Sequence, residues 1–242
     1  MKFYESGDNR KPVIFLFPGT CCLYSSFDHV LDGLHSYFYT VAVSYDGFDP
    51  NEKTEFYSME DECEKIEQEI RTKYGGRIKA AYGCSLGGSF VSLLIQRKRI
   101  HIDHGIIGSS DMDEAGNLVA KIQASMVVPF MYKMIHTGAL PKFMQKKLNK
   151  TDGAKKELYN GFLNMFGIGK GGSPWITKQS IYNQFYSDLV TKVQHGIDVL
   201  GTTIHVFYAT KMGKKYEKRY CTYFKNCLLY TSPSPRDKRQ SR

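Results

Sequence analysis

The chain has 242 residues, of which 42% are hydrophobic, and carries a formal net charge of +9. This length suits one α/β domain with an insertion, or two small domains, and either can bury a large core. No apolar run approaches the roughly 18 residues of a membrane-spanning helix, the N-terminus has no signal-peptide apolar region, and the six cysteines include no C-x-x-C pair. We therefore expect a cytoplasmic protein without a transmembrane segment, a metal scaffold or a disulfide framework.

Part of the positive charge gathers at the C-terminal end. Residues 231–242 hold four arginines and lysines but only one acidic residue, Asp237. The rest of the chain is modestly basic, and no basic run is interleaved with aromatic residues as in a nucleic-acid-binding motif. We therefore expect no nucleic-acid partner.

Strand and helix patterns alternate along the first 112 residues. Short β-rich runs predict strands at residues 11–17, 39–45, 78–82 and 101–108. Apolar residues at helical spacing predict helices at residues 26–34, 58–70 and from 86 onwards. The second of these helices begins with a capping-box pattern, Ser58-x-x-Asp61. Such alternation implies βαβ units and a mostly parallel sheet.

A G-x-S-x-G pentapeptide, Gly83-Cys84-Ser85-Leu86-Gly87, separates the strand at 78–82 from the helix that follows it. A sharp strand-to-helix turn holds a serine hydroxyl where a base can reach it, and small flanking residues avoid clashes in the turn. The helix that begins there directs backbone N–H groups towards a developing oxyanion. A serine that only caps a helix would not require both glycines. We therefore predict Ser85 as a nucleophile, with Gly83 and Gly87 forming the elbow.

The pattern changes at Asp113, after which the chain looks helical to about residue 196. Five of the nine methionines fall in this stretch. A strand pattern returns at residues 203–208 and is followed by a lysine-rich helix pattern at 214–224. Helices inserted between two strands of one sheet predict a cap over the carboxyl edge of the sheet, where such folds bind ligands. The predicted organisation is a core of residues 1–112 and 197–227 with a cap of residues 113–196.

With this elbow, the turn Pro18-Gly19-Thr20 after the first long strand and the late helical insertion, the chain resembles the α/β-hydrolase superfamily of serine esterases and lipases over roughly residues 1–227. The resemblance implies a mostly parallel sheet flanked by helices, with a helical cap inserted before the penultimate strand. It also implies catalysis without a cofactor or metal, by a Ser–acid–His triad with a two-donor oxyanion hole. By position, the donors are the backbone N–H groups of Thr20 and Leu86.

The resemblance leaves two candidates for the triad acid. Relatives usually carry it after the penultimate strand, where the loop at residues 209–213 has no carboxylate and Glu217 is the nearest. Other relatives carry it after the strand that follows the elbow, where Asp111 stands. We favour Asp111 and keep Glu217 as the alternative. The non-catalytic explanation of Asp111 is an N-cap of the first cap helix.

The catalytic histidine is missing from the expected place. In this superfamily it follows the last strand, beyond about residue 227 here, yet none of the seven histidines lies beyond His205. Residues 228–242 contain the run Ser-Pro-Ser-Pro-Arg, show no strand of adequate length, and have the composition of a disordered or non-native segment. We therefore expect that the native protein continues into a last strand and a histidine-bearing loop, and that this chain is inactive as written.

The composition of the cap indicates a class of substrate. Residues 115–151 contain six lysines and no aspartate or glutamate, and apolar residues are interleaved with the lysines. A methionine-rich apolar face can adapt to acyl chains, and lysines attract anionic substrates or an acidic membrane surface. The alternative is an ordinary solvated face.

Two functions follow. The first is a serine hydrolase that acts on an acyl ester or thioester through an acyl-enzyme on Ser85, with weak membrane contact through the basic cap. The alternative is a non-catalytic ligand-binding protein with the same fold, favoured by the missing histidine.

Overall fold

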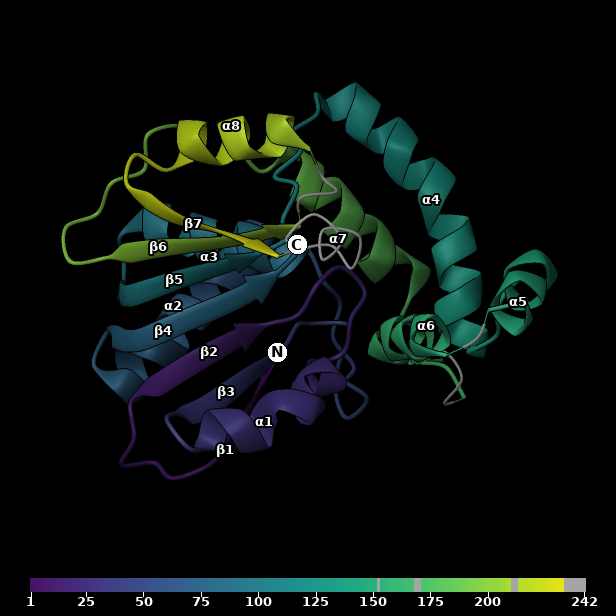
Figure 1. Ribbon diagram of the computed structural model, residues 1–242, viewed down its shortest axis with the longest axis horizontal. Coiled ribbons are helices and arrows are strands. Elements are labelled where there is room, and N and C mark those ends of the chain that lie inside the picture. The colour runs from purple at the N-terminus through teal and green to yellow at the C-terminus, as the bar shows by residue number, and fades with distance from the viewer. Residues whose placement is uncertain (152, 168–170, 210–212, 233–242) are drawn as a thin grey trace, which may run out of the picture.

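The computed structural model describes residues 1–151, 153–167, 171–209 and 213–232. Its centre is a seven-stranded sheet with the order β1-β3-β2-β4-β5-β6-β7 (Figure 1). The strands are β1 (Lys2–Ser6), β2 (Val13–Phe17), β3 (Tyr39–Ser44), β4 (Arg77–Cys84), β5 (His101–Gly108), β6 (Thr203–Ala209) and β7 (Cys227–Ser232). Only β1 runs antiparallel to its neighbour, β3. The prediction of a mostly parallel sheet is therefore confirmed.

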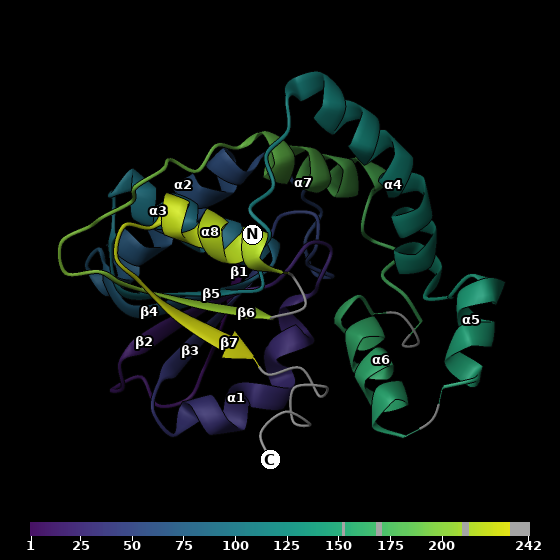
Figure 2. The same cartoon turned by 45° about the horizontal axis from the view of Figure 1, so that its top comes forward.

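Helices cover both faces of this sheet, and a group of helices extends beyond its carboxyl edge (Figures 1 and 2). The helices of the sheet layers are η1 (Tyr24–Phe27), α1 (Asp28–His35), α2 (Met59–Tyr74), α3 (Leu86–Arg97) and α8 (Lys214–Tyr223). The helices between β5 and β6 are α4 (Asn117–Thr137), α5 (Lys142–Asn149), α6 (Ala154–Met165) and α7 (Lys178–Val190). α1 lies on one face of the sheet and α2 and α3 on the other.

Local sequence features account for the boundaries of α2. The Ser58 side chain accepts a hydrogen bond from the Asp61 N–H at the start of the helix, as the capping-box pattern predicts. The helix ends at Gly75, whose φ of 65° is the left-handed conformation that glycine adopts without steric cost. Between these ends, Ile66 and Ile70 are fully buried. The apolar face thus holds α2 against the sheet.

Two strands were not predicted from the sequence. β1 is short, and it pairs antiparallel with β3 from Lys2 opposite Ser44 to Ser6 opposite Thr40. The expectation of no strand after Cys227 is wrong for residues 227–232, because β7 pairs in parallel with β6. An unpaired strand edge offers a row of free N–H and C=O groups to any extended segment. The expectation of disorder for residues 233–242 lies outside the described residues.

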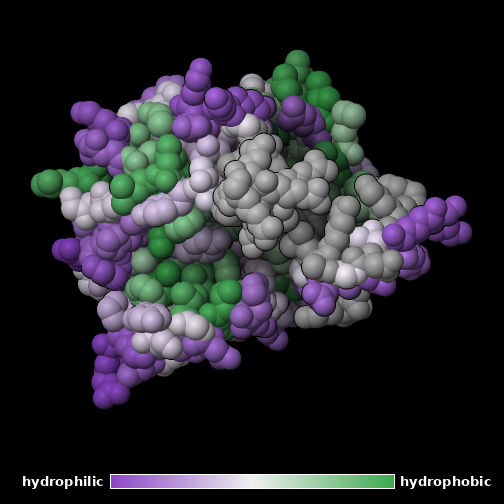
Figure 3. Space-filling view, viewed as in Figure 1, coloured by the Kyte–Doolittle hydropathy of each residue, from purple (hydrophilic) through white to green (hydrophobic). Residues whose placement is uncertain are grey.

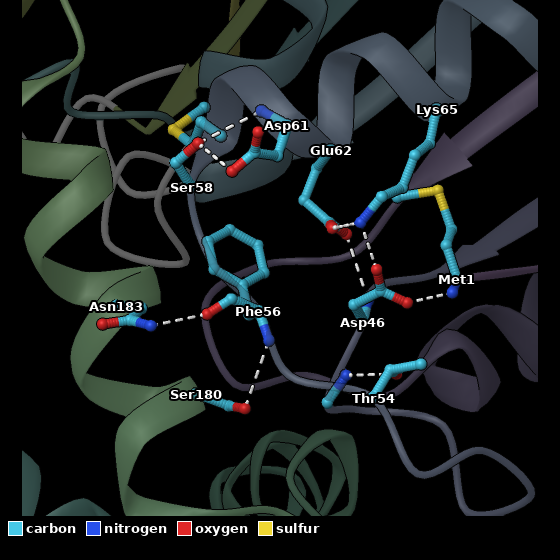
Figure 4. Close-up of polar contacts among 12 residues, drawn as sticks. Met1, Asp46, Thr54, Phe56, Ser58, Asp61, Glu62, Lys65, Ser180 and Asn183 are labelled. Carbon is cyan, nitrogen blue, oxygen red and sulfur yellow. Dashed lines mark hydrogen bonds and ion pairs between the residues drawn. The ribbon is translucent and has the colours of Figure 1, made fainter.

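The α7 helix is fixed to the core by hydrogen bonds to the loop that follows β3 (Figure 4). The Phe56 N–H donates to Ser180 Oγ at 3.3 Å, and Asn183 Nδ2 donates to the Phe56 carbonyl at 2.7 Å. The Met59 N–H donates to Ser187 Oγ at 2.8 Å. α4 in turn packs along α7. These contacts set the position of the helices that cover the carboxyl edge of the sheet.

A buried carboxyl group lies among charged partners at the end of β3 (Figure 4). Glu62 is fully buried, accepts the Asp46 N–H at 3.0 Å and pairs with Lys65 at 3.1 Å. Lys65 and the Met1 ammonium both pair with the Asp46 carboxylate. Burial, helped by the negative charge of Asp46, raises the pKa of Glu62 from 4.5 to about 7. The folded protein therefore binds a proton at Glu62 more tightly than the unfolded chain does.

Replacing this carboxyl by a neutral amide should stabilise the protein at alkaline pH. Because the folded-state pKa of Glu62 is raised, its ionisation costs stability as pH rises from about 4.5 to about 7, and the full cost is present above that range. We expect Glu62→Gln to raise the free energy of unfolding by about 1–3 kcal/mol at pH 8 and much less at pH 5. Urea unfolding at both pH values measures this difference.

The matched control is Glu64→Gln, which removes an exposed carboxyl group from the same helix. Its effect should be within about 1 kcal/mol and similar at the two pH values. A loss of stability in Glu62→Gln at pH 8 would contradict the expectation.

Candidate active site

Ser85 stands at the junction of β4 and α3 in a strained backbone conformation. Its φ is 53° and its ψ is −121°. Its N–H donates to the Gly108 carbonyl at 2.9 Å, and its own carbonyl accepts the Gly88 N–H at 2.8 Å. A non-glycine residue in this region costs about 1–3 kcal/mol and persists only where the surroundings impose it. The geometry is that of a strand–serine–helix elbow.

The neighbouring glycines are required by the space around the turn. A Cβ atom on Gly83 would lie 2.0 Å from the Gly87 carbonyl oxygen. A Cβ atom on Gly87 would lie 2.1 Å from the Phe17 carbonyl oxygen at the end of β2. Both obstacles are backbone atoms, which cannot rotate away as side chains do. The pentapeptide therefore owes its two glycines to the close approach of β2, β4 and α3.

The loop after β2 lies against this elbow. A Cβ atom on Gly19 would be 3.5 Å from the Ser85 Cβ. Within the loop, Cys21 has a φ of 60°, and its N–H donates to Gln184 Oε1 of α7 at 2.6 Å. As the first residue of α3, Leu86 has an N–H without an acceptor inside its helix. Thr20 and Leu86 thus flank Ser85, and their role as oxyanion donors remains a prediction.

A cavity of about 600 Å³ opens at Ser85 and runs beneath the helices that follow β5. Its lining is mostly apolar, as expected for a site that binds a small organic ligand. The core contributes Gly19, Thr20, Cys22, Cys84 and Ser85, and α4 and α7 contribute Gln123, Ala124, Met126, Val127, Met131, Phe185 and Leu189. The cavity is therefore walled on one side by the elbow and on the other by the inserted helices.

Three carboxyl groups line the same cavity: Asp111, Asp113 and Asp188. Arg219 of α8 pairs with the Asp113 carboxylate and donates to the Asp111 backbone carbonyl. Burial, helped by the negative charges of the other two carboxylates and opposed by a hydrogen bond from Ser89, raises the pKa of Asp188 from 3.8 to about 7. The structure therefore brings Ser85, Thr20 and the favoured acid candidate, Asp111, to one cavity.

Asp188 was missed in the sequence analysis. It is the only acidic residue of α7. A helical sequence pattern does not predict where the helix will pack, and so it does not predict which of its residues will line a cavity. Its position depends on the hydrogen bonds that fix α7 to the loop after β3, which join residues more than 120 positions apart.

The alternative acid candidate lies elsewhere. Glu217 is on α8, where its carboxylate accepts a hydrogen bond from Tyr208 Oη at 3.1 Å. It is not among the described residues that line the cavity of Ser85. Of the predicted loop at residues 209–213 that precedes it, residues 210–212 lie outside the described residues.

The cavity has no histidine among its described lining residues. His29 lines a separate cavity of about 470 Å³ beside Cys84. On the sheet, His104 and His205 are hydrogen-bonded to each other, with Nδ1 of the first 3.1 Å from Nε2 of the second. His35 contacts Ser6, and His195 packs on the Tyr223 ring. Among the described residues that line the cavity, no histidine is therefore placed to act as a base on Ser85.

The two thiols beside the elbow are poor substitutes for the serine. Burial raises the pKa of Cys22 from 9.0 to about 12, and burial also raises the pKa of Cys84. Since the thiolate is the reactive form, burial disfavours both sulfurs as nucleophiles.

Neither a family model nor a curated protein matches this sequence, but many solved structures match its fold. An alpha/beta hydrolase family protein from Desulfitobacterium hafniense matches with a TM-score of 0.74 at 13% identity, over 96% of this chain and 90% of that one. A thermophilic esterase from Thermogutta terrifontis matches with a TM-score of 0.70 at 12% identity, over 96% and 84%. An enol-lactonase from Burkholderia xenovorans matches with a TM-score of 0.67 at 14% identity, over 96% and 87%. At these identities, the likeness establishes a shared fold.

Proposed function

We propose, from the premise that this chain has the α/β-hydrolase fold, that it is a serine hydrolase acting on a carboxylic ester or thioester. The observation that carries the proposal is the strained Ser85 elbow at the mouth of an apolar cavity. An esterase and a thioesterase are among the solved structures with this fold. An apolar wall that includes Val127 and Met131 suits an acyl group.

In the proposed mechanism, Ser85 Oγ attacks the carbonyl carbon of the ester while a base takes the hydroxyl proton. The oxyanion that forms is stabilised by the backbone N–H groups of Thr20 and Leu86. The alcohol or thiol leaves with a proton, and the acyl group remains on Ser85 until water releases it. Asp111 is the proposed acid, because it lines the cavity and Glu217 does not.

We further propose that this chain turns over slowly. Seven histidines are present, and none is among the described residues of the cavity. Without its base, a serine hydrolase keeps only the contributions of the oxyanion hole and of substrate binding, roughly 10³- to 10⁴-fold over the uncatalysed reaction.

The cytoplasmic location of the protein, which we expect from the sequence, stays a prediction.

The lack of a histidine among the described cavity residues also supports the second candidate, a ligand-binding protein that never forms an acyl-enzyme. Its site would be the same cavity of about 600 Å³. In this case Ser85 would only begin α3, and acyl compounds would bind without bond cleavage.

A fluorophosphonate probe separates the two candidates. If Ser85 is a nucleophile, we expect slow phosphonylation, seen by mass spectrometry as a mass increase on the peptide that contains residue 85 and absent in Ser85→Ala. The matched control is Ser92→Ala, which removes a buried hydroxyl from the same helix and should leave the labelling unchanged. Folded protein that never gains the adduct during prolonged incubation would favour the ligand-binding protein.

A further inference from the structure

The α4 helix is apolar on two opposite sides. One side is buried against the rest of the protein through Ala120, Ala124, Val128 and Ile135. The opposite side exposes Leu118, Ile122, Met126 and Phe130, which follow one another at intervals of four residues. We call these four residues the α4 stripe. Leu118 is 72% and Met126 75% exposed, and Figure 3 shows hydrophobic residues gathered over the N-terminal part of α4.

Such a stripe is unusual for a helix at a protein–water boundary. A surface helix normally places polar residues opposite its buried face, and contiguous exposed apolar side chains mark a contact with a partner or a membrane. Among the described helices, α4 alone is long and apolar enough to cross a membrane by length and composition. Part of it is buried in the protein, and it contributes Ala124 and Val127 to the Ser85 cavity. Because α4 is packed against the rest of the protein in this way, we take it to lie along a membrane surface and not to cross a membrane.

The charges on α4 and on α5, the helix that follows it, favour an anionic occupant. The acidic residues just before α4, Asp113 and Glu114, are partnered by Arg219 and Tyr223. Residues 115–151 contain no acidic residue, and five of their lysines are exposed: Lys121, Lys133, Lys142, Lys146 and Lys150. Two copies of this chain that paired through their stripes would bring these lysines together and repel each other. An anionic bilayer instead provides both an apolar interior for the stripe and negative headgroups for the lysines.

We propose that the α4 stripe docks this protein onto the surface of an anionic lipid bilayer. In this arrangement α4 lies in the plane of the headgroups, with the stripe inserted about 5–10 Å and the lysines at the phosphates. Other residues of the same helix, Ala124 and Val127, line the Ser85 cavity together with Met126 of the stripe, so the docked protein holds its cavity at the membrane surface. Docking does not depend on catalysis, and its test uses binding alone.

Co-sedimentation with lipid vesicles tests the proposal. We expect the protein to bind vesicles that contain about 30% phosphatidylglycerol in phosphatidylcholine, and to bind pure phosphatidylcholine at least about tenfold more weakly. The double variant Leu118→Glu/Ile122→Glu, which places charge on the stripe, should lower binding to the anionic vesicles at least about tenfold. Circular dichroism should show an unchanged fold, because both side chains are exposed.

The matched control is Tyr57→Glu/Leu200→Glu, which adds the same charge at two exposed positions outside the inserted helices. It should retain binding within about twofold. Equal loss in the two double variants would show that net charge alone governs binding and would overturn the role of the stripe. The proposal also fails if the protein does not bind anionic vesicles. Dimers that form without lipid and are lost in Leu118→Glu/Ile122→Glu would instead identify the stripe as an interface between copies.

Discussion

Imidazole should accelerate ester hydrolysis by this chain at pH 8, and the acceleration should be absent in Ser85→Ala. The cavity at Ser85 is lined by Thr20, one of the two proposed oxyanion donors, and by the proposed acid Asp111, but by no histidine among its described lining residues. With a volume of about 600 Å³, it can admit a small base together with a short ester. A positioned general base contributes about 10²- to 10⁴-fold to such reactions, so a diffusing one should recover at least about tenfold.

The measurement is the release of p-nitrophenol from a short p-nitrophenyl ester as imidazole is added. Imidazole itself cleaves such esters, so the rate with Ser85→Ala is the background to subtract. Ser92→Ala should behave like the unmodified chain, because its hydroxyl donates to the Gly88 carbonyl away from the cavity lining. Equal dependence on imidazole in the unmodified chain and in Ser85→Ala would contradict a nucleophilic role for Ser85.

A fast reaction without imidazole would contradict a different part of the proposal. It would mean that a group other than histidine already serves as the base. Asp188 would then be the first residue to replace, since it lines the cavity and its pKa is raised to about 7 by burial.

Features that depend on neighbouring residues were predictable from the sequence. The capping box at Ser58, the apolar face of α2 and the strand-to-helix turn at Ser85 each need only a few consecutive positions, and the structure shows all three. The role of Ser85 as a nucleophile stays a prediction. The alternation of strands and helices likewise predicts a parallel sheet, because parallel neighbours require a crossover between them.

Features that depend on distant residues were not predictable. β1 pairs with β3, which lies nearly 40 residues away in the sequence. β7 is positioned by parallel pairing with the edge of β6. The choice between Asp111 and Glu217 could not be made from spacing. Asp111, three residues after β5, lines the cavity, whereas Glu217 accepts a hydrogen bond from Tyr208 of β6 and is not among the described lining residues. The set of carboxylates that line the cavity depends on how the helices between β5 and β6 pack over the sheet.

Substitution of Gly87 by alanine should strongly destabilise the protein. The new Cβ would lie 2.1 Å from the Phe17 carbonyl oxygen and 2.8 Å from its carbon. These atoms belong to β2, a central strand of the sheet, so relief of the clash requires β2 and α3 to separate. We expect a loss of at least about 3 kcal/mol in the free energy of unfolding.

A graded series of glycine variants makes this expectation testable even if Gly87→Ala does not fold. The Cβ of Gly88→Ala would meet Ser110 Cβ at 2.8 Å and Ile107 Cγ2 at 2.9 Å, which are side-chain atoms that can shift. Its loss should therefore be smaller, about 1–3 kcal/mol. Gly33→Ala, in α1, meets nothing within 4 Å and should stabilise the protein by about 0.5–1 kcal/mol, because glycine is unfavourable inside a helix. Urea unfolding of the three variants should give this order. A Gly87→Ala protein as stable as the unmodified chain would show that the elbow is looser than its packing implies, and Ser85 would then lose the strain that holds its hydroxyl at the cavity.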